Sequence, residues 1–246
     1  MSAETDEHLR ARLRAPATPQ TVPGSLPVLF FGDLFSASIA TVGLNPSNQE
    51  YTDKRGVLLD GDRQRFATLD SLRASDRSAL TDTQCDEAIQ WMRNYFDDGK
   101  PVYRWFTAHG RVADGLGASF ADGSVAHLDL VQESTYWIWS TLHETVREEL
   151  LRSNLPFLRW QISSFGLRAV ICTSKTVSRH VRSLFDITVA DTGELARIKW
   201  WVGFADVAGK RIGFAGWNFP LARPTGLGAD GERELGALLH EKLGIQ

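Results

Sequence analysis

The sequence predicts an α/β fold with three layers, in which helices cover both faces of a mainly parallel sheet of four to five strands. Two observations support this prediction. Short apolar runs at 39–42, 125–131 and 168–173 alternate with longer segments of helical periodicity. Each run also ends in a polar or turn-prone stretch, as parallel strands do at the edge of an open sheet, where ligands bind.

Composition sets the class of molecule. The chain has 246 residues and no Gly/Ser-rich or Pro-rich divider, which favours one domain. Residues 1–25 are charged and rich in Ala, Pro and Thr, so we expect them to form a flexible arm before a single domain over 26–246. No apolar segment approaches the roughly 20 residues of a membrane span, and we expect a cytoplasmic monomer without a membrane partner.

The two cysteines, Cys85 and Cys172, cannot build a zinc or iron–sulfur site by themselves. No G-x-G-x-x-G motif follows a strand, and no Walker motif is present. The sequence therefore predicts no metal and no other cofactor, and a dinucleotide or ATP enzyme has no support.

Charge is unevenly distributed along the chain. The formal net charge of −3 argues against a wholly basic nucleic-acid binder. Residues 159–223 nevertheless carry ten Lys and Arg against four Asp and Glu, whereas residues 1–158 carry a net −7 and the remaining tail −2. A local basic face is compatible with this pattern, and so is an ordinary solvated surface.

The first half of the chain contributes strands and one long helix. A β-prone run at 28–33 leads into the strand at 39–42, and the two together start the sheet. A long polar loop follows as far as residue 69, and loops of this length over a strand end are often functional. Apolar residues at helical spacing predict an amphipathic helix over 83–97.

The second half alternates helices with strands. The periodicity predicts a helix over 143–160, bent or interrupted at Pro156. Two late strands at 199–206 and 210–215 precede a closing helix over 230–243.

The strand at 168–173 runs directly into a predicted helix over 174–182. The amino end of this helix exposes backbone donors beside Ser174 and Lys175, an arrangement that suits a phosphate group. The same arrangement occurs at any junction between a strand and a helix, so both interpretations stay open.

The first strand ends in the candidate functional segment. Gly43 lets the backbone turn, and Pro46 favours extended geometry at Asn45, which presents the Asn45 amide at the carboxyl edge of the strand. Ser47 and Tyr51, which follow in the same polar segment, are candidate substrate contacts. The alternative is an ordinary Asn-Pro turn.

Phe66 lies in the long loop that follows. Its ring is a candidate for closing the site over a substrate, and packing in the core is the alternative.

The second strand carries an acidic residue in an apolar run. Because an unpaired buried carboxylate is costly, Asp129 must meet a hydrogen-bond donor, a water-filled pocket or a ligand. His127 lies on the same face of the strand by the two-residue period, so a structural His–Asp pair is the alternative.

The last strand leads into a loop at 216–226 that combines an amide, bulky apolar side chains, an arginine and two prolines. Together with Gly43-Leu44-Asn45-Pro46-Ser47, with Leu128-Asp129 and with the strand and helix from Val170, the segment Gly216-Trp217-Asn218-Phe219-Pro220-Leu221 resembles the uracil-DNA glycosylase superfamily. The likeness runs from about residue 28 to residue 223. It implies a uracil-DNA-glycosylase-like fold, DNA as partner and no metal.

The first motif is similar to the Gly-x-Asn-Pro-Gly motif of this superfamily, which implies that Asn45 positions the attacking water. The last is similar to the His/Asn-Pro-Ser-Pro-Leu loop, which holds the base. Alignment on the amide assigns Asn218 to the leaving base, whereas alignment on Pro-Leu places Trp217 there; we prefer Asn218, whose amide can hydrogen-bond the base. Phe219 and Leu221 are then candidate wedges and Arg223 a phosphate contact.

The resemblance implies a monofunctional DNA glycosylase, which extrudes a nucleotide and hydrolyses its N-glycosidic bond. Strict uracil enzymes of the superfamily carry a bulky Tyr after the motif proline, where this chain has Ser47, so the pocket is expected to be open beside pyrimidine C5. Asp129 stands where those enzymes have a base-reading Asn. A carboxylate accepts from the exocyclic amine of cytosine but repels uracil O4.

These two departures favour a cytosine with a C5 substituent, such as the hydroxymethylated or glucosylated cytosine of phage DNA, and a role in phage defence. The alternatives are a repair glycosylase for uracil or oxidised pyrimidine, a catalytically inactive DNA-binding module, and a small-molecule α/β enzyme.

Overall fold

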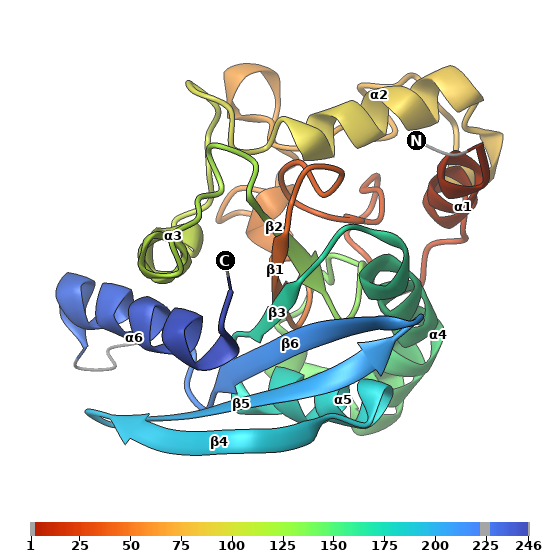
Figure 1. The fold of residues 1–246 in the computed structure, drawn as a ribbon. Helices are drawn as coiled ribbons and strands as arrows, with labels where there is room; N and C mark the ends of the chain where they lie inside the picture. The colour runs from red at the N-terminus through yellow and green to blue at the C-terminus, as the bar shows by residue number, and fades with distance from the viewer. Residues whose placement is uncertain (1–2, 222–226, 246) are drawn as a thin grey trace.

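A six-stranded mixed sheet forms the centre of the computed structural model, which describes residues 3–221 and 227–245 (Figure 1). The strands are β1 (Ile39–Gly43), β2 (Val125–Asp129), β3 (Ala169–Cys172), β4 (Thr188–Leu195), β5 (Ile198–Val207) and β6 (Lys210–Trp217). Their order in the sheet is β2-β1-β3-β6-β5-β4. The first four in this order run parallel, and β5 and β4 pair antiparallel at one side. The α/β class and the mainly parallel sheet are thus confirmed.

Helices flank this sheet. The long helices are α1 (Ala3–Leu13), α2 (Asp82–Arg93), α3 (Phe106–Gly115), α4 (Glu144–Ser164), α5 (Lys175–Phe185) and α6 (Gly228–Leu243). A Cβ placed on Gly213 of β6 would meet Leu243 of α6, whereas one on Gly216 would meet Ser178 of α5. Residues three apart on a strand face opposite sides, so α5 and α6 cover opposite faces of the sheet.

The central strands are buried on both faces. Every residue of β1, β2 and β3 is buried, as the short continuous apolar runs predict. The edge strand β4 is different, because its residues alternate between exposed and half-buried. That alternation lacks an apolar face, which is why the sequence prediction of four to five strands missed this sixth strand.

The β-prone run at 28–33 does not form a strand. Residues 28–31 are buried, and Phe31 makes an isolated antiparallel bridge with His127 at the outer side of β2. The segment therefore covers the outer strand with buried apolar side chains, and its composition suggested a strand because buried extended chain and sheet use the same residues.

The N-terminal segment forms a helix and not the flexible arm that composition predicts. Leu9 and Leu13, one helical turn apart on α1, are fully buried. Arg10 forms ion pairs with Asp82 and Asp86 of α2, which hold α1 against that helix. The expectation of a flexible arm is wrong over residues 3–13, because two leucines among many charged residues are enough to dock a helix.

Helix α4 runs from Glu144 to Ser164 with Pro156 in its interior. The helix is continuous across this proline, so the expected interruption is not seen. Pro156 is exposed, whereas Phe157 and Leu158 beside it are buried and hold the helix on the core. No helix among residues 3–221 and 227–245 is long and apolar enough to cross a membrane.

Candidate functional site

A pocket of about 200 Å³ opens at the carboxyl ends of β1, β2 and β3. Five residues proposed from the sequence line it: Asn45, Ser47, His127, Asp129 and Ser174. They come from three separate segments, and the parallel strand pairing brings these segments to one edge, with Gly43 of β1 opposite Asp129 of β2. The site therefore lies where open α/β sheets bind their ligands.

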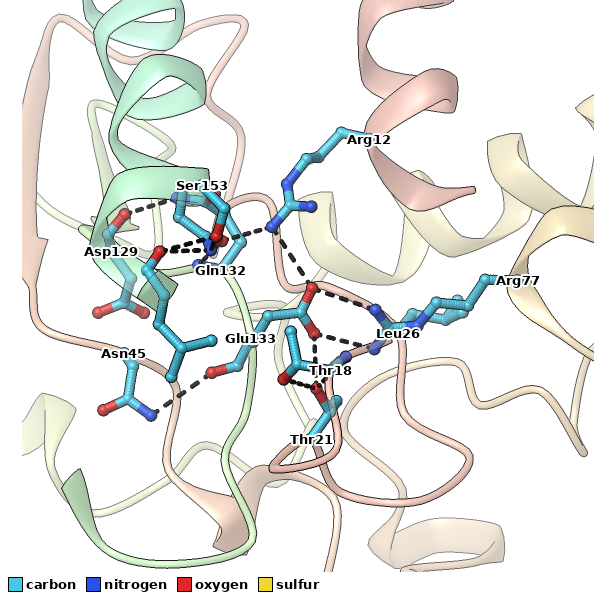
Figure 2. Close-up of polar contacts among 12 residues, drawn as sticks. Arg12, Thr18, Thr21, Leu26, Asn45, Arg77, Asp129, Gln132, Glu133 and Ser153 are labelled. Carbon is cyan, nitrogen blue, oxygen red and sulfur yellow. Dashed lines mark hydrogen bonds and ion pairs between the residues drawn. The ribbon is translucent and has the colours of Figure 1, made fainter. Parts of the chain in front are cut away.

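The side-chain amide of Asn45 is fixed in orientation. Its Nδ2 donates to the carbonyl oxygen of Pro46 at 3.1 Å, to that of Glu133 at 3.4 Å and to Thr135 Oγ1 at 3.1 Å. Its Oδ1 has no hydrogen-bond partner among the described residues, and Figure 2 shows this oxygen on the side turned away from Glu133. The amide therefore presents a free acceptor at the pocket, suited to binding a water molecule.

The loop behind Asn45 is anchored by a buried carboxylate (Figure 2). Glu133 receives two hydrogen bonds from Arg77, at 3.1 and 3.0 Å, and lies 3.4 Å from Arg12 of α1. Thr21 Oγ1 donates to the same carboxylate at 3.3 Å. Because the Glu133 backbone carbonyl is one of the Asn45 acceptors, this ion-pair cluster fixes the position of the amide.

Asp129 ends β2 inside the pocket with one oxygen unpaired. Its Oδ1 lies 3.5 Å from His127 Nε2, and the other ring nitrogen of His127 is hydrogen-bonded to Thr41 Oγ1 at 2.8 Å. Asp129 Oδ2 is buried and has no partner among the described residues. A buried carboxylate oxygen without a partner is unusual, and in a pocket it is an acceptor available to a ligand.

Gly43 is required beside this carboxylate. A Cβ at this position would lie 2.5 Å from Asp129 Oδ1 and 2.9 Å from the His127 ring. The glycine of the first motif therefore makes room for the acidic residue on the neighbouring strand.

Glu50 is a pocket residue that the sequence prediction missed. It follows Ser47 in the short 3₁₀ helix η1 (Asn48–Glu50), lines the pocket and is 2 % exposed. Tyr95 donates its hydroxyl to Glu50 Oε2 at 2.8 Å, and Arg65 Nε lies 4.0 Å away. Burial raises the pKa of Glu50 to about 8, so the side chain carries a proton at neutral pH.

Aromatic side chains form part of the pocket lining. The rings that line the pocket belong to Phe31, Tyr103, Trp105 and Phe106. Trp105 lies with its ring centroid 4.8 Å from that of His127. The segment 101–106 is rich in aromatic residues, and this composition was the signal available in the sequence.

Tyr51 and Phe66 lie in the core and not in the pocket. Both are 1 % exposed, their ring centroids are 5.6 Å apart, and the Tyr51 hydroxyl donates to the Leu26 carbonyl at 2.9 Å. The expected substrate contacts are therefore corrected to packing contacts, because the rings are used in an aromatic cluster with Phe31 and Tyr95.

We call the last motif, residues 216–221, the second motif. Of its residues, Pro220 lines the pocket and the others do not. Asn218 donates its backbone N–H to the Lys199 carbonyl at 3.1 Å, and its Oδ1 accepts from the Lys199 N–H at 2.9 Å. Its amide thus extends the pairing of β5 with β6 and is not in the pocket, contrary to its expected role. Trp217 is 1 % exposed and also lies outside the pocket lining.

The proposed wedges differ in exposure. Phe219 is 48 % exposed and remains a candidate, whereas Leu221 is 4 % exposed and is buried against the core. Arg223 lies outside the described residues.

Ser174 and Lys175 separate at the start of α5. Ser174 caps the helix by accepting from the Val177 N–H at 3.3 Å and lines the pocket. Lys175 lines an adjoining open groove of about 1370 Å³, which we call the α5 groove and which also holds Arg179, Arg182 and Asn218. Among the described residues, no group of three or more His, Cys, Asp and Glu could hold a metal ion.

The raised pKa of Glu50 makes stability depend on pH. The folded chain keeps a proton that the unfolded chain releases above pH 4.5, so the free energy of unfolding falls as pH rises from 4.5 towards about 8, then levels off. Between pH 5.5 and 7.5 the wild type should lose about 2 kcal/mol relative to Glu50→Gln, measured by denaturant unfolding. Glu148→Gln, at an exposed position of α4, is the control; parallel curves for wild type and Glu50→Gln would refute the assignment.

The Glu133 cluster should be essential for folding. Arg77→Met leaves the buried carboxylate with Arg12 as its one cationic partner among the described residues and is expected to cost about 3 to 5 kcal/mol of unfolding free energy. Adding Glu133→Gln to Arg77→Met should restore part of this loss, because the unpaired charge is removed. Arg152→Met, at an exposed position of α4, should change stability little. Equal unfolding midpoints for Arg77→Met and Arg152→Met would contradict the role of the cluster.

No protein-family model matches the chain, and no curated protein sequence matches it. At one sheet edge the pocket brings together an oriented amide, a buried acidic side chain and a carboxylate oxygen that has no partner among the described residues.

Proposed function

We propose that this chain is a monofunctional DNA glycosylase, which binds an extruded nucleotide and hydrolyses the bond between its base and its sugar. The observation that carries the proposal is the Asn45 amide, with its nitrogen bound by three acceptors and its oxygen free at the pocket. At about 200 Å³ the pocket is smaller than the roughly 300 to 1,000 Å³ of drug-sized sites, and it suits a single extruded base.

The amide supports hydrolysis by orientation. A neutral Asn is too weak a base to deprotonate water, but a sugar that develops oxocarbenium character needs an oriented water more than a deprotonated one. The Asn45 oxygen accepts a hydrogen bond from that water and directs its lone pair at C1′. The water oxygen then bonds to C1′ as the bond to the base breaks, and the released proton balances the charge of the departing base.

The departing base must be stabilised by groups other than Asn218, whose amide is bound to Lys199 outside the pocket. Glu50 supports this role because it lines the pocket and carries a proton at neutral pH. A neutral carboxylic acid donates a hydrogen bond to a base that gains negative charge. This assignment replaces the one that resemblance gave to the second motif.

The base favoured by the pocket is a cytosine with a C5 substituent. Asp129 Oδ2 is a buried acceptor with no partner in the part of the chain that the structure describes, and such an acceptor matches an exocyclic amine and repels the O4 of uracil. Ser47, the small residue after the motif proline, lines the same pocket and leaves space for the substituent. Cytosine bases that carry such a group, hydroxymethylated or glucosylated, occur in phage DNA, which fits a defence role.

Base release tests the proposal directly. The protein is incubated with duplexes that carry cytosine, uracil, hydroxymethylcytosine or glucosylated hydroxymethylcytosine, and abasic sites are cleaved with alkali. Asn45→Ala should slow base release by about 100-fold or more. Asn218→Ala is the matched amide control and should retain most of the rate. Absence of abasic sites in every duplex, or equal loss in both variants, would overturn the assignment.

Asp129→Asn tests how the base is read. An amide can donate to uracil O4, so this variant should shift the ratio of rates towards uracil by about tenfold or more. An unchanged ratio would instead support a structural His127–Asp129 pair and ordinary repair of uracil or oxidised pyrimidine.

A further inference from the structure

Besides the pocket and the α5 groove, the structure has an open groove of about 750 Å³ next to the pocket. We call it the basic groove. Its walls come from the loop at 48–56, from Val102 to Arg104 and from the segment 136–138. Tyr103 lines both cavities, and Gln49 of the groove is next to Glu50 of the pocket on η1. The groove and the pocket therefore adjoin at Tyr103 and η1.

Positive charge dominates this groove. Lys54, Arg55, Arg65 and Arg104 line it, against the single carboxylate of Asp53. Arg65 is held by the carbonyls of Pro101 and Gln49. Lys54, Arg55 and Arg104 are exposed and form no ion pair within the described residues, so their charges face solvent.

Large apolar side chains stand exposed at the same place. Tyr136, Trp137 and Ile138 are 44, 62 and 70 % exposed. Isolated exposed apolar residues are ordinary, but three consecutive ones that line a groove indicate an interaction site.

The exposed segment is held rigidly. Asn48 donates to the Tyr136 carbonyl at 3.0 Å, and Thr135 Oγ1 donates to the Trp137 carbonyl at 2.8 Å. Thr135 Oγ1 also accepts a hydrogen bond from Asn45. One hydroxyl therefore links the Trp137 backbone to the side-chain amide of the pocket. Because these hydrogen bonds hold the backbone that carries the rings, less backbone entropy is lost when a partner binds.

We propose that the basic groove binds the DNA strand that flanks the extruded nucleotide. Arg55, Arg104 and Lys54 contact its phosphates, and Trp137 stacks on a base next to the pocket. The inference rests on the proposed function, since it names the surface by which the same site holds its substrate. Cations interleaved with exposed rings match a strand, whose phosphates are anionic and whose bases each have a flat face.

Phosphate contacts and ring stacking contribute to binding in the groove in two different ways. Phosphate contacts release counterions, so log K falls as log salt rises. Each lost contact makes this negative slope shallower by about 0.7 to 0.9. Stacking on an aromatic ring does not release counterions and leaves this slope unchanged. The two kinds of residue are therefore separable by one titration series.

The experiment measures fluorescence anisotropy of a labelled duplex and a labelled single strand, each with one glucosylated hydroxymethylcytosine, between 50 and 300 mM salt. Arg55→Glu/Arg104→Glu should weaken binding by about tenfold or more and lower the salt slope by about 1.5 to 2. Trp137→Ala should weaken binding by about fivefold or more with an unchanged slope. All altered positions are exposed, so the variants should fold, and their circular dichroism is checked against the wild type.

The matched control is Arg168→Glu/Lys210→Glu. Both residues are exposed, and they lie at the amino ends of β3 and β6, at the opposite edge of the sheet from the pocket. This control changes the net charge equally and should keep wild-type affinity within about twofold.

Three outcomes would overturn the inference. If groove and control variants bind DNA equally while the wild type releases the base, the groove assignment is wrong and the glycosylase proposal stands. If the groove variants lose affinity for an RNA strand of the same sequence and not for DNA, the partner is wrong. If the wild type binds no DNA and releases no base, the proposed function fails together with the inference.

Discussion

The buried carboxylate of Glu133 is the constraint on which the site depends. Two arginines from distant parts of the chain, Arg12 and Arg77, converge on it, and its own backbone carbonyl receives the Asn45 amide. A charge removed from water is tolerated only where such partners are complete. The same requirement that stabilises the fold therefore fixes the loop at 132–135 and, through it, the direction in which the Asn45 oxygen points.

The register of β1 with β2 fixes the position of Asp129 relative to Asn45. Gly43 lies opposite Asp129 in the parallel pairing of β1 with β2, and its missing side chain is what allows the carboxylate to fit. Asn45 follows two residues later, so the acceptor proposed to hold water and the acceptor proposed to hold the base come from adjacent strand ends. A one-residue shift of this register would turn Asp129 to the other face of the sheet.

The local sequence was sufficient to predict the central strands and two of the helices, because buried strands and amphipathic helices leave their pattern in it. The helices expected over 83–97 and 174–182 correspond to α2 (Asp82–Arg93) and α5 (Lys175–Phe185). The local sequence also placed Asn45 and Asp129 correctly, since the carboxyl ends of parallel strands meet at one edge. Asn218 was misplaced because its amide pairs with the Lys199 backbone, a contact without a local signature. Glu50 was missed because a Glu in a polar loop suggests exposure. Its burial depends on residues that are distant in the sequence, among them Tyr95, which follows α2 and donates a hydrogen bond to it.

The arginine of α1 that reaches Glu133 is separated from it by 121 residues of chain. During synthesis the first helix leaves the ribosome long before the loop that it must meet, and closing so long a separation is entropically slow. The cluster that fixes the loop behind the Asn45 amide is therefore complete only when the amino-terminal helix has docked. Any local opening that releases this helix also takes one of the two arginines away from Glu133, so the loop behind the Asn45 amide loosens before the sheet itself comes apart.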